Sequence, residues 1–391
     1  MAIAFMIPFA KKFVPGFIGL LMLYVITNAL RKRRIQHPNN LLPQLLLLAI
    51  FALHVVGLAW SEHIHEGLNE TGIKLSYFAF PVIAWLMPAI NKKQLQQIVM
   101  AFVHGCMAFI LLAIGYGIYR SITLNDIVYL GYQELGIYLH PTYAATYMAM
   151  AYFLLMQNAA RKDYFYNRRS LHYSVSLVLL VFISMLASKA GLLAALISIL
   201  MAVIVFLQNK KTIAKTISIT ITSIVVLVVS TLIAPGTSMR VEAAMHDVES
   251  KHEQTSAIVE AKSSTQLRLV TWSAAWSILK ENPFGVGTGD SESTLVTKYN
   301  EMEEPYAAEK LLNAHNQFLQ SGIEHGWLGM ILLLLLTSIV AYTSIRKMHW
   351  LMINFIILCA MNFLFESFLE VQAGIVFFCF WIAVAGKSGD D

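Results

Sequence analysis

Lys189 is the first of three residues whose type and position suit substrate binding or proton transfer. It lies between two long apolar runs, in the sequence Ser188-Lys189-Ala190-Gly191. An ammonium group at a membrane boundary can bind an anionic headgroup that enters from the bilayer. It can equally anchor a helical hairpin, because a lysine stem packs on apolar surface while its charge reaches water. Position alone leaves both interpretations open.

Arg268 is the second such residue and lies one helical turn before Trp272. An arginine fork suits phosphate because it offers several hydrogen-bond donors and a charge that does not titrate. The competing interpretation is an amphipathic helix resting on lipid headgroups, with Arg268 and the tryptophans as interface anchors. From these residues alone, the interface anchor is the stronger interpretation.

His315 is the third residue, followed by Asn316 at the start of a helical stretch that leads into the membrane near Trp327. A neutral imidazole can take the proton from a hydroxyl nucleophile near neutral pH. A single histidine at a helix start is more often a capping or packing residue, and the chain has 12 histidines. Alone, His315 is a weak indication of catalysis.

Three further groups carry weaker signals. The glycine-rich segment 284–289 does not indicate nucleotide binding, since no strand precedes it and no Lys-Ser/Thr pair follows. Its amides can hold phosphate or simply form a tight turn. Glu366 and Glu370, one helical turn apart, can accept sugar hydroxyls or form solvated helix ends. We expect neither a metal nor a cofactor. A solvated loop explains the remaining candidate ligands better than a metal site does. Those ligands are Glu62, His63, His65 and Glu66.

The elements that must position these residues are membrane-spanning helices. Hydrophobic residues make up 57% of the chain and charged residues 13%, whereas a soluble domain is roughly a quarter charged. Several apolar runs reach the ~20 residues that a helix needs to cross a bilayer. This composition predicts an all-α, polytopic integral membrane protein of about eleven or twelve transmembrane helices. The predicted spans lie near 14–30, 41–60, 73–90, 95–119, 137–158, 171–187, 190–207, 212–234, 327–345, 349–365 and 370–386.

Basic clusters fall in alternate loops between these spans, which predicts that those loops are cytoplasmic. This topology accounts for most of the formal charge of +5, so the charge does not indicate a nucleic-acid partner. The chain then divides into N-terminal membrane helices (1–234), one long extracytoplasmic helical loop (235–326) and C-terminal membrane helices (327–391). The clusters are Arg31 to Arg34, Lys92-Lys93, Arg161-Lys162 with Arg168-Arg169, Lys210-Lys211 and Arg346-Lys347.

The extracytoplasmic loop contains thirteen acidic and seven basic residues. Its first part, Ala243–Ser263, is polar without a strong apolar stripe. Residues 266–280 then predict an amphipathic helix that ends at Asn282-Pro283. The apolar face of this helix comprises Leu267, Val270, Trp272, Ala275, Trp276 and Leu279. We expect a second helical stretch, from about 311 to 322, to run into the next span.

The order and spacing of five short motifs resemble the O-antigen ligase and polymerase superfamily. The resemblance covers the chain from about residue 60 to its end, and the order of the motifs is more specific than any one of them. They are His140-Pro141-Thr142-Tyr143, Ser188-Lys189-Ala190-Gly191, Arg268 with Trp272 and Ala275, Asn282-Pro283-Phe284-Gly285 with Gly287 and Gly289, and Ala314-His315-Asn316 with Phe318-Leu319.

This resemblance implies an inverting glycosyltransferase of the GT-C type. Such enzymes transfer a glycan from undecaprenyl diphosphate to a hydroxyl acceptor, at the periplasmic face of the bacterial inner membrane. The resemblance implies that Arg268 binds the diphosphate and that His315 is the base. Lys189 stands where the family usually has arginine, so it keeps the charge but loses the two-pronged fork. No metal is needed, because cations on the protein stabilise the departing diphosphate.

We expect Trp272, Asn316 and Glu366 to contribute to substrate binding as well. A ligase, whose acceptor is a sugar of the lipid A core, is preferred because there is one long outer loop rather than two. The alternative within the family is a polymerase that joins lipid-linked repeats. An alternative of another class is a transporter or flippase of lipid-linked sugars. A transporter should carry charges near the centres of its spans, whereas the candidate charges here collect at the outer rim.

Overall fold

The computed structural model describes residues 1–9, 13–32, 38, 40–137, 139–163, 166, 168–208, 213–234 and 264–388. These residues form helices and no strand, apart from an isolated bridge between Ile90 and Ser388. The predicted all-α class is therefore confirmed. The predicted polar stretch 243–263 lies outside the described residues.

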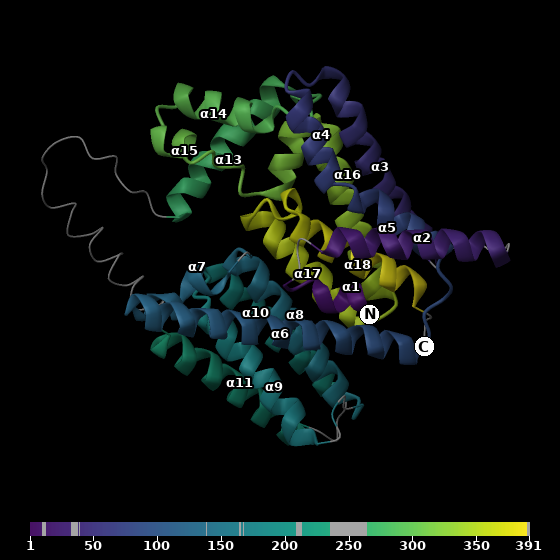
Figure 1. Cartoon of the computed structure of the whole chain (residues 1–391), viewed down its shortest axis with the longest axis vertical. Helices are drawn as coiled ribbons and strands as arrows, with labels where there is room; N and C mark the ends of the chain where they lie inside the picture. Colours follow the sequence, from purple (N-terminus) through teal and green to yellow (C-terminus); the bar gives the residue numbers. More distant parts are fainter. Residues whose placement is uncertain are drawn as a thin grey trace, which may run out of the picture. The chain divides into compact units, whose positions relative to one another are not determined.

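The chain forms two compact units, each built from separate stretches of sequence. Unit 1 comprises residues 1–17, 93–255 and 344–358, and unit 2 comprises residues 18–92, 256–343 and 359–391. The helices of both carry their labels in Figure 1. The division predicted from topology concerns the membrane helices and the extracytoplasmic loop between them, and it stays a prediction. Its segments are 1–234, 235–326 and 327–391.

Unit 1 is organised around α8 (Pro141–Ala160), which packs against α9 and α10. Nearly every residue of α8 is buried, so its polar groups need partners inside the protein. One of them, the Tyr152 hydroxyl, lies 2.8 Å from the Ser223 hydroxyl of α11. The other helices wholly within this unit are α1 (Ala2–Met6), η2 (Ile127–Leu130), α7 (Tyr132–Leu135), α9 (Arg169–Met185), α10 (Lys189–Leu207) and α11 (Ile213–Ile233), and α6 (Lys92–Leu124) belongs to it from Lys93 on.

Unit 2 contains the segments that carry most of the candidate site. Its α5 packs against α3 and α18, while α13, α14 and the residues that follow enclose a small apolar core that includes Ile278, Leu295 and Tyr299. Its elements are α3 (Leu41–Gly57), η1 (Leu58–Trp60), α4 (Ile64–Ile73), α5 (Ser76–Leu86), α13 (Ser264–Glu281), α14 (Ser291–Glu301), α15 (Pro305–Glu309), η5 (Phe368–Glu370) and α18 (Gln372–Lys387), with most of α2 (Val14–Lys32), most of α16 (Gln317–Arg346) and the end of α17 (Trp350–Phe365).

Six helices among the described residues are long and apolar enough to cross a membrane. They are Val14–Arg31, Leu41–Trp60, Lys92–Leu124, Lys189–Leu207, Ile213–Ile233 and Gln317–Arg346. Three shorter apolar helices, α9, α17 and α18, coincide with predicted spans. The multi-pass membrane character is thus confirmed. The predicted span 73–90 differs, because its helix α5 has only 11 residues, about 16 Å at 1.5 Å per residue.

Helix α13 forms where the amphipathic helix was predicted, and it ends at Glu281, directly before Asn282-Pro283. One part of its predicted apolar face is wrong, since the side chain of Trp276 is 41% exposed while Ala274 and Ile278 are buried. The buried stripe is turned toward positions 271, 274, 275 and 278, because the core of this unit lies on that side.

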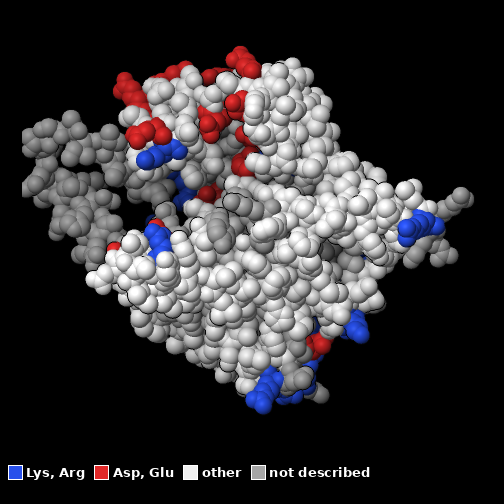
Figure 2. All heavy atoms as spheres, in the orientation of Figure 1, with Lys and Arg blue, Asp and Glu red and all other residues white. Residues whose placement is uncertain are grey.

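The prediction of a helix beginning near residue 311 is also wrong. Leu311 and His315 have left-handed backbone angles, with φ of +48° and +44°, which interrupt a right-handed helix. Helix α16 begins only at Gln317. The short helices α14 and α15, which were not predicted, precede this segment. Figure 2 shows acidic side chains gathered over α14 and α15, where Glu292, Glu301, Glu303 and Glu309 are exposed.

Helix α16 is broken at His325 and Gly326, and the segment between α13 and α14 packs against the break. Gly326 has a φ of +64°, and a Cβ atom there would lie 2.0 Å from the Pro283 carbonyl oxygen, so glycine is required. Three backbone hydrogen bonds join the two segments: Val286 N–H to the Ile323 carbonyl (2.9 Å), Gly287 N–H to the Glu324 carbonyl (3.1 Å) and Trp327 N–H to the Pro283 carbonyl (3.0 Å).

Candidate functional site

Glu366 connects two of the predicted site residues in unit 2. Its Oε1 atom accepts a hydrogen bond from Arg268 Nη2 at 3.0 Å, and its Oε2 atom lies 3.2 Å from His315 Nδ1. The Glu366 side chain is only 8% exposed, whereas those of Arg268 and His315 are 24% and 29% exposed. A buried carboxylate therefore holds two partly exposed groups that can still contact a substrate.

Helix α13 positions Arg268 against the end of α17. Its Nε atom donates to the Phe365 carbonyl at 3.1 Å, beside the contact with Glu366. The guanidinium plane is thus held at two points. An arginine has five N–H donors, and two of them serve these contacts.

Trp272 and the residues after α15 hold His315 in place. Trp272 Nε1 donates to the His315 carbonyl at 3.2 Å, and Thr271 Oγ1 donates to the Ala314 carbonyl at 3.2 Å. The His315 N–H in turn donates to Asn313 Oδ1 at 3.0 Å. These contacts stabilise a left-handed conformation that costs a non-glycine residue of order 1–3 kcal/mol. The binding of substrate by Trp272 stays a prediction.

Asn316 begins α16. Its Oδ1 atom accepts hydrogen bonds from the N–H groups of Phe318 and Leu319 at 3.0 and 3.1 Å, as a helix cap does. Its Nδ2 atom donates to the Leu364 carbonyl at 3.3 Å. The capping role that was considered for His315 thus belongs to Asn316. The contact of Asn316 with substrate stays a prediction.

The arrangement of His315 and Glu366 suits general-base chemistry. A carboxylate accepts hydrogen bonds, so it favours the imidazole tautomer that carries its proton on Nδ1. Nε2 then presents a lone pair that can take a proton from a hydroxyl group. This is the relationship of a base to the group that orients it.

Two of the other motifs meet in unit 1. His140 precedes α8, where its Nδ1 atom accepts a hydrogen bond from Thr142 N–H at 3.4 Å. The Thr142 hydroxyl lies 3.0 Å from the hydroxyl of Ser188, which caps α10 by accepting from Gly191 N–H at 3.2 Å. Lys189 follows as the first residue of α10 and is exposed. Its participation in the site stays a prediction.

The glycine-rich segment is occupied by contacts within unit 2. The amides of Val286 and Gly287 donate to α16 carbonyls, and Gly289 N–H donates to Ser61 Oγ at 3.1 Å. Of the two interpretations of the glycines, the tight turn fits these contacts, and the amides are not directed at a phosphate.

The interpretation of Glu366 and Glu370 as solvated helix ends is wrong, because both side chains are engaged inside the protein. Glu370 Oε2 accepts from Lys74 Nζ at 2.5 Å, and its Oε1 accepts from Gln317 Nε2 at 2.7 Å. The Lys74 side chain is 2% exposed. An ammonium group this deeply buried requires a carboxylate partner, and Glu370 supplies it.

The predicted loop ligands contact other groups. His63 Nδ1 lies 2.6 Å from Asp290 Oδ1, and this hydrogen bond raises the pKa of His63. His65 Nδ1 lies 3.1 Å from Asn69 Nδ2. Neither histidine belongs to a group of converging ligand atoms among the described residues.

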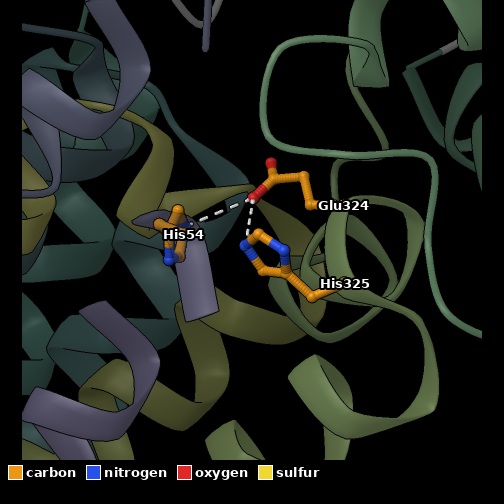
Figure 3. Close-up of side chains that lie close together, drawn as sticks. All are labelled: His54, Glu324 and His325. Carbon is orange, nitrogen blue, oxygen red and sulfur yellow. Dashed lines mark ion pairs between the residues drawn. The ribbon is translucent and has the colours of Figure 1, made fainter. Parts of the chain in front are cut away.

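Sequence reasoning missed a second set of ionisable residues in unit 2. His54, Glu324 and His325 are buried with their ligand atoms close together (Figure 3). The signal was present, because His54 interrupts the predicted span 41–60 and Glu324-His325 precedes the span near 327. An ionisable residue inside or beside an apolar run is a functional candidate by default.

Comparison with protein families decides what kind of chain carries this geometry. Residues 174–334 match the family model described as O-antigen ligase. Residues 174–334 are therefore similar to an O-antigen ligase domain. The match confirms the resemblance found from the motifs, and the domain includes Lys189, Arg268 and His315, whereas Glu366 lies beyond it. No curated protein matches the chain.

An O-antigen ligase domain indicates a function of the ligase or polymerase kind and a glycosyltransferase-like enzyme. Together with the membrane-spanning helices it implies that the substrates include lipid-linked glycans in a lipid bilayer.

Proposed function

We propose that the protein transfers a glycan from undecaprenyl diphosphate to a hydroxyl of a lipid A-core sugar, at the periplasmic face of the inner membrane. The single observation that carries this proposal is the bridge of Glu366 between Arg268 and His315. A cation for the leaving group and a base for the nucleophile belong to one hydrogen-bonded unit.

In the proposed reaction the acceptor hydroxyl oxygen attacks the anomeric carbon of the donor sugar, on the face opposite the diphosphate. A new glycosidic bond forms, and the bond between that carbon and the diphosphate oxygen breaks with inversion. His315 Nε2 takes the acceptor proton, which is typically worth a factor of about 10² to 10⁴ in rate. Undecaprenyl diphosphate leaves with the electron pair.

Arg268 stabilises the charge that builds up on the departing diphosphate. Its contacts with Phe365 and Glu366 fix the guanidinium plane, and its remaining donors are assigned to phosphate oxygens. Lys189 is proposed as a second cation for the diphosphate. Trp272, Asn316 and Glu366 complete the proposed binding surface, with Glu366 acting through the two residues that it holds.

A transfer assay with purified full-length protein and a lipid-diphosphate glycan tests the proposal. We expect the glycan to appear on a lipid A-core acceptor with inverted anomeric configuration. Glycan accumulating on lipid in a deletion strain, with core left unmodified, supports the ligase. Single repeats on the core support the polymerase alternative. Movement of the lipid-linked glycan across vesicles without any transfer would overturn both and favour a flippase.

A further inference from the structure

Three buried side chains of unit 2 face one another at the break in α16. The His54 Nε2 atom lies 3.5 Å from Glu324 Oε2, and the His325 Nε2 atom lies 3.7 Å from the same oxygen. The three residues are 4%, 1% and 2% exposed. Figure 3 shows the carboxylate directed at both imidazole rings. The cluster is thus closed to bulk water and built from the side chains that bind metals.

The orientation of His54 is fixed by its backbone contact. Its Nδ1 atom lies 2.8 Å from the Ile50 carbonyl oxygen, which can only accept a hydrogen bond, so Nδ1 carries the proton. Nε2 of the neutral ring then directs a lone pair toward the Glu324 carboxylate. Two lone pairs that face each other repel unless a proton or a cation lies between them.

The contact between His54 Nδ1 and the Ile50 carbonyl is also typical of a histidine that binds a metal through its other ring nitrogen. Such a histidine almost always donates its second ring N–H to a carbonyl or a carboxylate. Glu324 is oriented in the same way, since its Oε1 atom accepts from Gln320 Nε2 at 2.9 Å and leaves Oε2 toward the imidazoles. Among the described residues, His54 Nε2 and both ring nitrogens of His325 are buried without a hydrogen-bond partner.

Carboxyl groups outnumber ammonium groups around the cluster. Ligand oxygens of Glu70, Glu324 and Glu370 lie within 4.8 Å of one another. Lys74 is the ammonium that pairs with them, through Glu370. Three carboxylates against one ammonium leave two negative charges, which protons or one divalent cation would offset. Buried charge left without such compensation is strongly unfavourable.

We propose that His54 Nε2, His325 Nε2 and Glu324 Oε2 bind one divalent transition-metal ion, with zinc as the best match. At metal–ligand distances of about 2.0–2.1 Å, the edges of a tetrahedron are about 3.4 Å long. The distances of 3.5 and 3.7 Å between the ligand atoms fit these edges. Two histidines with one glutamate are an established zinc ligand set, and the fourth position remains for water or a further carboxylate.

In this proposal the ion has a structural role, which is separate from the proposed transfer reaction. Glu324 lies seven residues after Gln317, the first residue of α16, which is about 10 Å along a helix. The ion would link α3 to the break in α16, close to the turn between α13 and α14 that packs against this break. This revises the expectation of no metal, which was argued from the solvated loop at His63 and His65 and from the protein cations that would stabilise the diphosphate.

Metal content and thermal stability of the full-length protein test the proposal. The protein is purified in detergent without chelator and then exposed to zinc. We expect about one zinc per chain, and a Tm that EDTA lowers and added zinc restores. The His54→Ala and His325→Ala variants should lose the zinc and the response of Tm. The His65→Ala variant, which removes an exposed histidine of the same unit, should keep both.

The measurement on the wild-type protein does not depend on whether a variant folds. The proposal would be overturned if the wild-type protein held no more zinc than His54→Ala and its Tm changed with neither EDTA nor zinc. Protons shared within the cluster would then be the better explanation. Zinc that remains in His54→Ala but is lost in His65→Ala would also overturn it, because the ion would then bind at the loop.

Discussion

The Nδ1 atom of His315 lies 3.2 Å from Oε2 of Glu366, although 51 residues separate them in the sequence. If His315 is the base, His315→Ala should leave donor affinity nearly unchanged and lower turnover by about 10²-fold or more. His315→Gln should be equally inactive, because an amide cannot accept the proton. Turnover and donor affinity, measured separately on a lipid-diphosphate glycan, check this. A fully active His315→Gln variant would remove His315 from the mechanism.

Glu366→Gln should lower turnover by at least about 10-fold, because the amide no longer favours the imidazole tautomer with its proton on Nδ1. Glu301→Gln, which alters an exposed carboxylate of the same unit, is the matched control and should behave as wild type. The measurement is kcat at saturating donor, with the Tm as a check on folding. An unchanged kcat in a folded Glu366→Gln protein would contradict the positioning role.

Arg268→Ala should weaken donor binding by about 10- to 100-fold, the loss expected for charge-assisted hydrogen bonds. Arg268→Lys should restore little of the donor binding, because lysine lacks the two-pronged fork of arginine. The single change also leaves the buried Glu366 carboxylate without its arginine, so stability falls as well. The double variant Arg268→Ala with Glu366→Gln should recover the Tm but not the donor affinity. Recovery of both would assign Arg268 a purely structural role.

Lys189→Ala should lose donor binding, while Lys189→Arg should retain at least part of the activity, because the charge matters more than the shape at this position. Lys310→Ala is a suitable control, since its side chain is also exposed and pairs only loosely with Glu309 at 3.9 Å. Donor affinity determined by titration checks the difference. Wild-type affinity in Lys189→Ala would make Lys189 an anchor of its helix.

The pair of His63 and Asp290 predicts a pH-dependent contribution to stability. The hydrogen bond with Asp290 raises the pKa of His63. A histidine whose pKa is higher in the folded state stabilises the fold fully at a pH below its unfolded-state pKa of about 6.5. This stabilisation is lost as the pH rises through the folded-state pKa. The Tm difference between wild type and His63→Gln should therefore shrink as the pH rises above about 6.5. A difference that grows with pH would contradict the interaction, and His65→Gln serves as the control.

Local patterns predicted the parts of this protein that depend on local forces. The amphipathic period gave α13, and Asn282-Pro283 predicted its end, because a proline cannot continue the hydrogen bonds of a helix. The motif positions predicted Arg268 and His315 before any geometry. Their roles in the site stay predictions. The O-antigen ligase match over residues 174–334 confirms the resemblance, which rested on the order of the motifs rather than on any one residue.

Long-range contacts are the part that the sequence did not reveal. The partners Arg268 and Glu366 are 98 residues apart, and Lys74 and Glu370 are 296 residues apart. No periodicity links such residues, so Glu370 was interpreted as a possible solvated end rather than as the partner of a buried lysine. The left-handed turn at His315 was missed for a related reason, since Trp272 and Thr271 of another helix stabilise it.

The break in α16 also affects how deep the site can lie. A backbone group without a partner costs several kcal/mol in hydrocarbon, so an interrupted helix would normally have to remain at the aqueous surface. Here Pro283, Val286 and Gly287 supply hydrogen bonds at the break. The start of α16 can therefore lie beneath the headgroup layer. If His315 is the proposed base, a lipid-anchored diphosphate would not need to leave the bilayer to reach it.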